Sequence, residues 1–174
     1  MAEIRTAIES DFSTIHEIYS YYVENSSATF EITTPSPEDM HSRLQGILDS
    51  GLPFIVAEIE GEVVGYAYAS SYRRRSGYQY TLEDSVYIKD GFSRKGLGKS
   101  LLNNLIDQCE SLDYKQLLAV ITIESGVSEK VSPSTHLHEA CGFETSGRLI
   151  GVGSKFDKCY DTLLMQKTLG SNAR

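Results

Sequence analysis

The chain has 174 residues, of which 40% are hydrophobic and 23% are charged, and its formal net charge is −8 at pH 7. This length fits one compact domain with a substantial core, and the acidic balance argues against a general nucleic-acid binder, which usually carries a broad basic surface. No apolar stretch approaches the length of a membrane span, and the segment 1–5 lacks the apolar run of a signal peptide.

The three cysteines, Cys109, Cys141 and Cys159, are scattered along the chain and form no CxxC pair. This pattern is typical of reduced thiols, so we expect a cytoplasmic protein without a disulfide framework. His136 and His138 lack the i, i+4 spacing that puts two metal ligands on one helix face, so we expect no metal site.

The periodicity of the apolar residues predicts both helices and strands. In chain order, the expected elements are a strand at 4–8, a helix from 10 to 19, a weaker extended segment at 29–32, a helix at 37–49, strands at 54–58, 63–70 and 80–88, a helix after Gly98, a strand at 114–123, a short helix at 134–141, and strands at 144–152 and 161–165. Ser36 is the expected N-cap of the second helix, with Pro37 at its first position, and Gly142 is expected to end the short helix.

This order of elements predicts an α/β fold. Runs of adjacent strands flank a single strand-turn-helix-strand unit, which implies a mixed sheet and not a fully alternating Rossmann pattern. No internal repeat or long linker divides the chain, so we expect a single domain over residues 1–170 and a flexible C-terminal tail over 171–174.

The most informative segment is a strand followed by a glycine turn and a helix. Ser85–Ile88 leads into Arg94, Lys95, Gly96 and Gly98. A helix N-terminus that follows a glycine turn presents several backbone N–H groups and the positive end of the helix dipole, and it therefore favours an anion. The alternative is a plain turn between a strand and a helix with solvated basic side chains.

A second phosphate motif overlaps this turn, because Gly98-Lys99-Ser100 resembles the end of a P-loop. That motif requires a glycine five positions before Gly98, where this chain has Ser93. The turn also follows a group of antiparallel strands, which is an unusual setting for a P-loop. The nucleotide hydrolase interpretation is therefore disfavoured.

The segment Ser93–Gly98 resembles the pyrophosphate signature of the GNAT superfamily of N-acetyltransferases, Arg/Gln-x-x-Gly-x-Gly/Ala, with Ser93 in place of the usual Arg or Gln. Segments over nearly the whole chain are similar to the phosphinothricin and methionine sulfoximine acetyltransferase group of that superfamily. Among them are Ala28–Glu31, Val64–Ala69, Thr81–Tyr87, Leu137–Glu139 and Gly151–Phe156. One region departs from the group, because 124–133 is longer than usual and lacks the asparagine that helps to hold the pantetheine arm.

The resemblance implies a GNAT fold, which is a mixed, mostly antiparallel sheet of about six or seven strands with splayed central strands, flanked by about four helices. It also implies transfer of an acetyl group from acetyl-CoA to the α-amino group of a small amino-acid analogue, by direct attack in a ternary complex. We accordingly expect a homodimeric, metal-independent enzyme of detoxification whose partners are its small substrate and acetyl-CoA, and neither a nucleic acid nor a membrane.

The same resemblance assigns roles to individual residues. Glu83 is the expected general base, and Asp84 lies on the opposite face of the strand. His138 is expected to protonate the departing thiolate or to position the substrate. The expected cofactor-binding residues are Val86, Tyr87, Ile88, Arg94, Lys95, Gly96, Gly98, Lys99, Ser100 and Ser134. The expected substrate-binding residues are Phe30, Arg73, Arg75 and Lys155.

Other functions remain open from the sequence. The chain could acetylate another small amine or a protein N-terminus, or it could be an acetyl-CoA-binding sensor that has lost catalysis. Cys141 could be proposed as an acyl-enzyme nucleophile, but a cysteine before Gly-Phe at a helix end is more often a small core residue.

Overall fold

The computed structural model describes residues 2–170, so the predicted tail at 171–174 lies outside the described residues. Seven strands form one sheet in the order β1-β2-β3-β4-β5-β7-β6. The elements are β1 (Glu3–Thr6), α1 (Phe12–Asn25), α2 (Pro37–Asp49), β2 (Phe54–Ile59), β3 (Glu62–Ser71), β4 (Thr81–Ile88), α3 (Leu97–Ser111), β5 (Gln116–Glu124), α4 (Pro133–Ala140), β6 (Glu144–Lys155) and β7 (Lys158–Thr168). The predicted α/β fold with a mixed, mostly antiparallel sheet is confirmed.

Local sequence signals explain where the helices begin and end. The side chain of Ser36 accepts a hydrogen bond from the backbone N–H of Asp39 at 3.1 Å, and α2 starts at Pro37 as predicted. Gly142 follows α4 with a φ of 84°, a conformation that glycine adopts easily. The prediction of an extended strand segment at 29–32 is wrong, because these residues lie in the irregular connection between α1 and α2.

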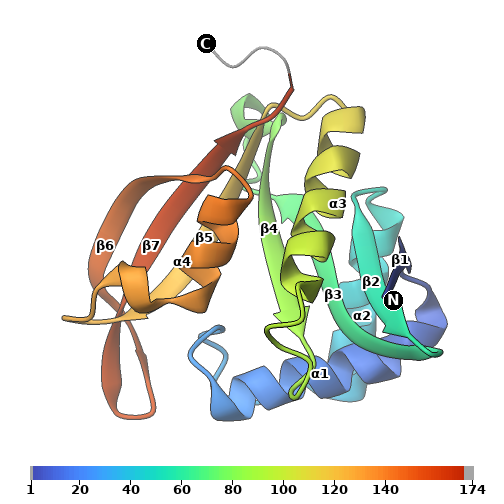
Figure 1. The fold of residues 1–174 in the computed structure, drawn as a ribbon, viewed down its shortest axis with the longest axis horizontal. Coiled ribbons are helices and arrows are strands. Elements are labelled where there is room, and N and C mark those ends of the chain that lie inside the picture. The colour runs from blue at the N-terminus through green and yellow to red at the C-terminus, as the bar shows by residue number, and fades with distance from the viewer. Residues whose placement is uncertain (1, 171–174) are drawn as a thin grey trace.

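The two central strands, β4 and β5, diverge after a short parallel ladder. β4 and β5 pair only from Thr81 with Gln116 to Glu83 with Leu118. Beyond that point β4 stays with β3 as far as Ile88, and β5 stays with β7 as far as Glu124. The strands therefore diverge toward their C-terminal ends, as Figure 1 shows between β4 and β5.

Helices cover both faces of the sheet. On one face, Leu101, Leu102 and Leu105 of α3 are fully buried in the larger of two hydrophobic clusters. On the other face, Ile15 of α1 and Leu44 of α2 pack in a second cluster with side chains of β2 and β3. α4 lies beside α3 on the β5 side of the gap (Figure 1). Within residues 2–170, no helix combines the length and the apolar character that a membrane span requires.

Candidate functional site

The edge of β4 that faces the gap carries backbone groups without a strand partner. At its C-terminal end, the hydroxyl of Tyr22 donates to the carbonyl oxygen of Ile88 at 2.8 Å and accepts from the N–H of Ile88 at 3.4 Å. Because backbone groups alternate between the two sides of a strand, those of Val86 face the same side as those of Ile88, whereas those of Tyr87 face β3. The backbone N–H and carbonyl groups of Val86 therefore face the gap.

The turn that precedes α3 combines left-handed backbone conformations with the start of a helix. Arg94 and Gly96 have φ values of 63° and 78°, both in the left-handed region, and backbone of this kind is common in turns that bind anions. Gly96 is the N-cap of α3 and provides no side-chain cap, which leaves the first N–H groups of the helix available. The ammonium of Lys95 lies 4.6 Å from the ring centre of Phe92, beside the turn.

The first turn of α3 contains the remaining predicted phosphate contacts. Lys99 and Ser100 are exposed there. Gly98 has a packing role as well, because a Cβ atom at this position would lie 3.2 Å from Leu137 Cδ2 of α4. The absence of a side chain at Gly98 thus lets α4 approach the N-terminal end of α3.

Glu83 lies at the closed end of the gap, because it is the last β4 residue that pairs with β5. Its side chain is half-buried. Burial, reinforced by the negative charge of Asp84, raises the pKa of the Glu83 carboxyl above its ordinary value. A carboxyl group with a raised pKa is suited to proton transfer near neutral pH.

His138 is buried on α4 and contacts Asp84 from the other side of the gap. Its Nε2 lies 3.1 Å from Asp84 Oδ1, and its Nδ1 lies 2.7 Å from the carbonyl oxygen of Ser134. Burial disfavours the charged imidazolium, but the hydrogen bond and charge of Asp84, together with the Ser134 carbonyl, raise the pKa of His138 above its ordinary value. Phe143 packs edge-on against the imidazole ring, with 5.0 Å between ring centres.

Two of the predicted substrate residues meet at the connection between α1 and α2. Lys155 is only 4% exposed, and its ammonium donates to the carbonyl oxygens of Ser26 at 2.7 Å and Thr29 at 2.9 Å. The ring of Phe30 lies over Gly153, where a Cβ atom would be 2.2 Å from Phe30 Cζ. Lys155 thus holds the backbone of the segment that presents Phe30.

The other two predicted substrate residues lie at the opposite end of the split strands. Arg73 and Arg75 belong to the connection that leads from β3 into the start of β4. Phe30, by contrast, packs on Tyr160, which pairs with Glu124 at the end of β5. The guanidinium of Arg73 stacks over a neighbouring tyrosine ring, 5.0 Å from its centre, and Arg75 is exposed. The structure therefore separates the predicted substrate residues into two groups along the gap.

Comparison with known proteins identifies the family. The model of the acetyltransferase (GNAT) domain matches residues 4–164. The chain is a GNAT acetyltransferase.

The relatives of this GNAT acetyltransferase include enzymes with named substrates. It is 42% identical over 168 residues to the phosphinothricin N-acetyltransferase of Alcaligenes faecalis, covering 97% of this chain and 83% of that protein. It is 31% identical to the L-methionine sulfoximine/L-methionine sulfone acetyltransferase of Salmonella typhimurium, and the alignment covers 98% of this chain and 96% of that protein. Among solved structures, the chain is similar to a GNAT superfamily phosphinothricin acetyltransferase from Sinorhizobium meliloti, whose crystal structure is a complex with AcCoA. The two sequences are 40% identical, the TM-score is 0.90, and the match covers 99% of this chain and 90% of that chain.

Sequence reasoning missed a polar cluster beside Phe30 in this GNAT acetyltransferase. The hydroxyl of Tyr19 donates to the carboxylate of Glu31, and Arg43 Nη1 lies 2.8 Å from Glu31 Oε1. Burial and the hydrogen bond to Glu31 raise the pKa of Tyr19 to about 12. The Tyr19 ring packs edge-on against Tyr87 of β4 at 5.5 Å, which connects the cluster to the gap.

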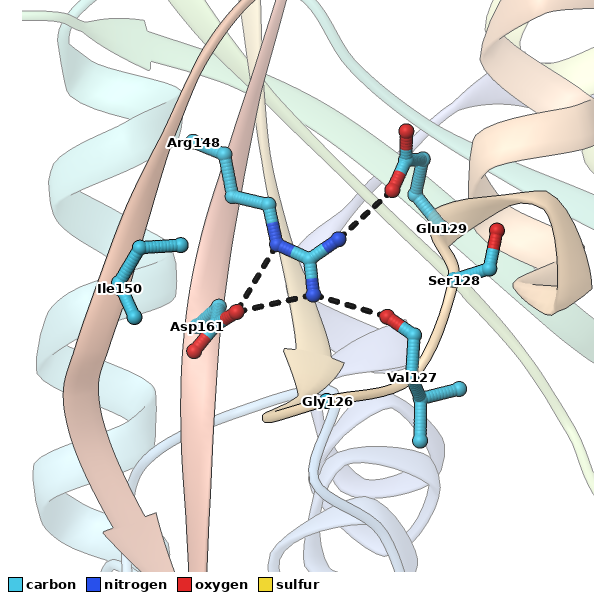
Figure 2. A pocket seen from close by; sticks show the side chains of 7 residues that line it. All are labelled: Gly126, Val127, Ser128, Glu129, Arg148, Ile150 and Asp161. Atoms are coloured by element: carbon cyan, nitrogen blue, oxygen red, sulfur yellow. Dashed lines mark hydrogen bonds and ion pairs between the residues drawn. The ribbon is translucent and has the colours of Figure 1, made fainter.

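Sequence reasoning also missed the anchor of the long segment between β5 and α4. Figure 2 shows that Arg148 of β6 donates to Glu129 Oε2 at 2.6 Å, to the carbonyl oxygen of Val127 at 2.8 Å and to Asp161 Oδ2 at 2.9 Å. Asp161 of β7 also accepts from Ser125 Oγ at 2.5 Å. These bonds fix the atypical 124–133 region against the β6–β7 hairpin, beside an open cavity of about 560 Å³.

Proposed function

We propose that this GNAT acetyltransferase transfers an acetyl group from acetyl-CoA to the α-amino group of a small amino-acid analogue of the phosphinothricin or methionine sulfoximine type. The observation that carries the proposal is the gap between β4 and β5, which has an anion-binding turn beyond one end and the carboxyl of Glu83, with its raised pKa, at the other. The named relatives support the choice of acceptor.

The residues of the gap fit the proposed cofactor. The turn at Arg94, Lys95 and Gly96 offers N–H groups and positive charge to the diphosphate, and the start of α3 at Gly98, Lys99 and Ser100 extends that site. The free backbone edge at Val86 offers hydrogen bonds to the amides of the pantetheine arm. Ser134 lies in the first turn of α4, on the other side of the gap. Acetyl-CoA supplies the activated acetyl group when it is bound there.

Glu83 is the proposed general base. It takes a proton from the ammonium of the acceptor, directly or through water, and the free amine then attacks the thioester carbonyl. The backbone N–H of Val86 faces the gap and is the proposed donor to the oxyanion of the tetrahedral intermediate. Collapse of that intermediate breaks the C–S bond and expels the CoA thiolate, and the second proton of the attacking nitrogen passes, directly or through water, to that thiolate. The products are the neutral amide and CoA, formed in one ternary complex without an acyl-enzyme.

About 20 Å of β5 separates the two groups of predicted substrate residues, which is more than a small acceptor spans, so we propose that the two groups act separately. Phe30 would form a wall of the acceptor site, held by Lys155 from behind. The guanidinium groups of Arg73 and Arg75 suit the oxygens of a phosphinate, sulfoximine or carboxylate group. Arg75 is the better candidate for a direct contact, because Arg73 already stacks on Tyr72.

We also propose that the enzyme is a cytoplasmic homodimer that serves in detoxification. Free thiols at all three cysteines are consistent with a reducing compartment. β6 is an edge strand of the sheet, and it exposes Leu149, Ile150 and Val152, with Ile150 72% exposed. An apolar edge of this kind suits pairing with a second copy. Light scattering of the wild type and of Ile150→Lys tests this: a monomeric wild type contradicts the dimer.

One assay tests the acceptor directly. Release of free CoA is measured with phosphinothricin, methionine sulfoximine, a polyamine and a peptide with a free N-terminus. We expect the first two to give a kcat/KM at least about 100-fold above the others. Turnover with the peptide alone would point to a protein acetyltransferase, and acetyl-CoA binding without any turnover would point to a sensor.

A further inference from the structure

A buried contact between a histidine and an aspartate crosses the gap where the two central strands diverge. Glu83 is the last β4 residue paired with β5, and Asp84 is the next residue of β4. His138 comes from α4, which follows β5 in the chain, and its Nε2 reaches Asp84 Oδ1 at 3.1 Å. The pair therefore connects the β4 side of the gap to the β5 side at its closed end.

Both ring nitrogens of His138 face acceptors. Nε2 faces a carboxylate and Nδ1 lies 2.7 Å from the Ser134 carbonyl oxygen, and neither group can donate when Asp84 is ionised. Both bonds are made only when both nitrogens carry hydrogen, which is the imidazolium form. The side chains of His138 and Asp84 are 5% and 3% exposed, so water contributes little to either.

The surroundings favour a charged partner for Asp84. Its second oxygen, Oδ2, is buried and has no hydrogen-bond partner among residues 2–170. The titratable groups around the pair are Cys109 of α3, Cys141 after α4 and Glu83 of β4, with Lys99 and Lys167 acting on Cys141. Within this set, His138 is the group that contacts Asp84 and is able to carry a positive charge, and an unpaired buried carboxylate is costly.

We propose that Asp84 is a positioning residue that keeps His138 doubly protonated and fixed, so that His138 braces α4 against β4 and provides a constant positive charge beside the thioester. In this role His138 does not give its proton to the departing thiolate. The location beside the thioester rests on the proposed function, in which a pantetheine arm running from the turn at Gly96 back along β4 would end near Asp84.

The protonation state can be measured without any substrate. The chain has four histidines, and long-range proton–nitrogen NMR spectra follow each of them from pH 5 to 9, with His138→Gln to assign the signal. We expect His138 to stay doubly protonated above the pH range in which an ordinary histidine loses its proton. In Asp84→Asn, the midpoint of His138 should fall by about one pH unit or more. A neutral His138 at pH 7 in the wild type, or an unchanged midpoint in Asp84→Asn, overturns the proposal.

Kinetics test whether the pair acts as a unit. We expect Asp84→Asn and His138→Gln each to lower kcat by about 10-fold or more, and the double variant to lose no more than the worse single variant. Asp84→Glu, which keeps the carboxylate, should recover part of the loss. Additive losses in the double variant, or a kcat of Asp84→Glu no higher than that of Asp84→Asn, overturn the proposal.

Two controls separate this proposal from folding and from the choice of acceptor. Asp107→Asn, on the exposed face of α3, and His136→Gln should leave kcat unchanged. Calorimetric binding of acetyl-CoA needs no acceptor, and we expect Asp84→Asn to weaken it because the brace at the closed end of the gap is loosened. If the NMR spectra show the expected protonation of His138 but no acceptor is turned over, the proposed function is refuted, whereas the effect of Asp84 on His138 is still supported.

Discussion

The ammonium of Lys155 lies 2.7 Å from the carbonyl oxygen of Ser26, at the residue that caps the C-terminal end of α1. Carbonyl oxygens at a helix C-terminus lack partners within the helix and carry the negative end of its dipole. A buried cation from the β6–β7 hairpin therefore fixes the point where α1 gives way to the segment that carries Phe30. The hairpin thereby determines the shape of the proposed acceptor site.

Lys155→Met should loosen this segment. The variant keeps most of the apolar stem but removes all the donors, so the carbonyl oxygens of Ser26 and Thr29 lose their partner. We expect kcat/KM for the acceptor to fall by about 10- to 100-fold, while the Kd of acetyl-CoA stays within about twofold. Lys158→Met, in the same hairpin but exposed and paired with Glu124, is the matched control. Equal losses in both variants would argue against a specific role for Lys155.

Gly153→Ala should disturb Phe30 through steric conflict alone. The new methyl group would lie 2.2 Å from Phe30 Cζ, so the ring must move. The same substitution at Gly147, also on β6, meets no atom within 4 Å. We expect Gly153→Ala to raise the KM for the acceptor by about 10-fold and Gly147→Ala to leave it unchanged, as measured by steady-state kinetics. If both variants behave like the wild type, Phe30 is not part of the acceptor site.

Glu83→Gln should abolish most of the turnover without affecting the cofactor. We expect kcat to fall by about 100-fold or more, since the amide cannot accept the proton, while acetyl-CoA binds with unchanged affinity. Glu139→Gln, on an exposed position of α4, should have no effect.

The pH profile provides a second measure of the same group. Because burial raises the pKa of Glu83, the wild-type kcat/KM should begin to fall with decreasing pH above the range in which ordinary carboxyl groups titrate. This acidic limb should disappear in the residual activity of Glu83→Gln. Its persistence would assign the titration to another group.

Arg148→Met should release the segment between β5 and α4. Hydrogen bonds from Ser125, the N–H of Gly151 and Arg148 lower the pKa of Asp161, so the ionised carboxylate stabilises the fold above the ordinary aspartate pKa, and that contribution is lost as the pH falls through the lowered value. Without Arg148, we expect Tm at pH 7 to drop by several degrees and the loss of Tm on acidification to become smaller, because the folded-state pKa of Asp161 then lies closer to its ordinary value.

Thermal unfolding from pH 7 to pH 3 measures both effects of Arg148→Met, and Lys115→Met, with its 54% exposed side chain, is the control. The KM for acetyl-CoA should rise as well, because the released segment leads directly into α4 and Ser134. Parallel Tm curves for Arg148→Met and the wild type would contradict the coupling between Arg148 and Asp161.

Much of the fold follows from signals that are local in the sequence. Ser36 and Pro37 predict the start of α2 because capping and a fixed φ act within one turn of a helix. The anion turn at Gly96 is predictable for the same reason, since the strand, the glycines and the helix start are consecutive. The prediction of an extended segment at 29–32 fails as a strand because its polar groups bind Lys155 and one another. Lys155 is 126 positions from Thr29 along the chain, so local periodicity cannot predict this contact.

The sequence by itself determined the order of the elements, the family and the position of the turn that begins α3. The tertiary structure alone decided which side chains meet: Asp84 with His138, 54 residues apart, and Lys155 with Ser26, 129 residues apart. It also decided that Arg73 and Phe30 lie at opposite ends of the gap. These contacts depend on strand register and on the divergence of β4 from β5, and both arise from the packing of the whole sheet against its helices, which no single segment encodes.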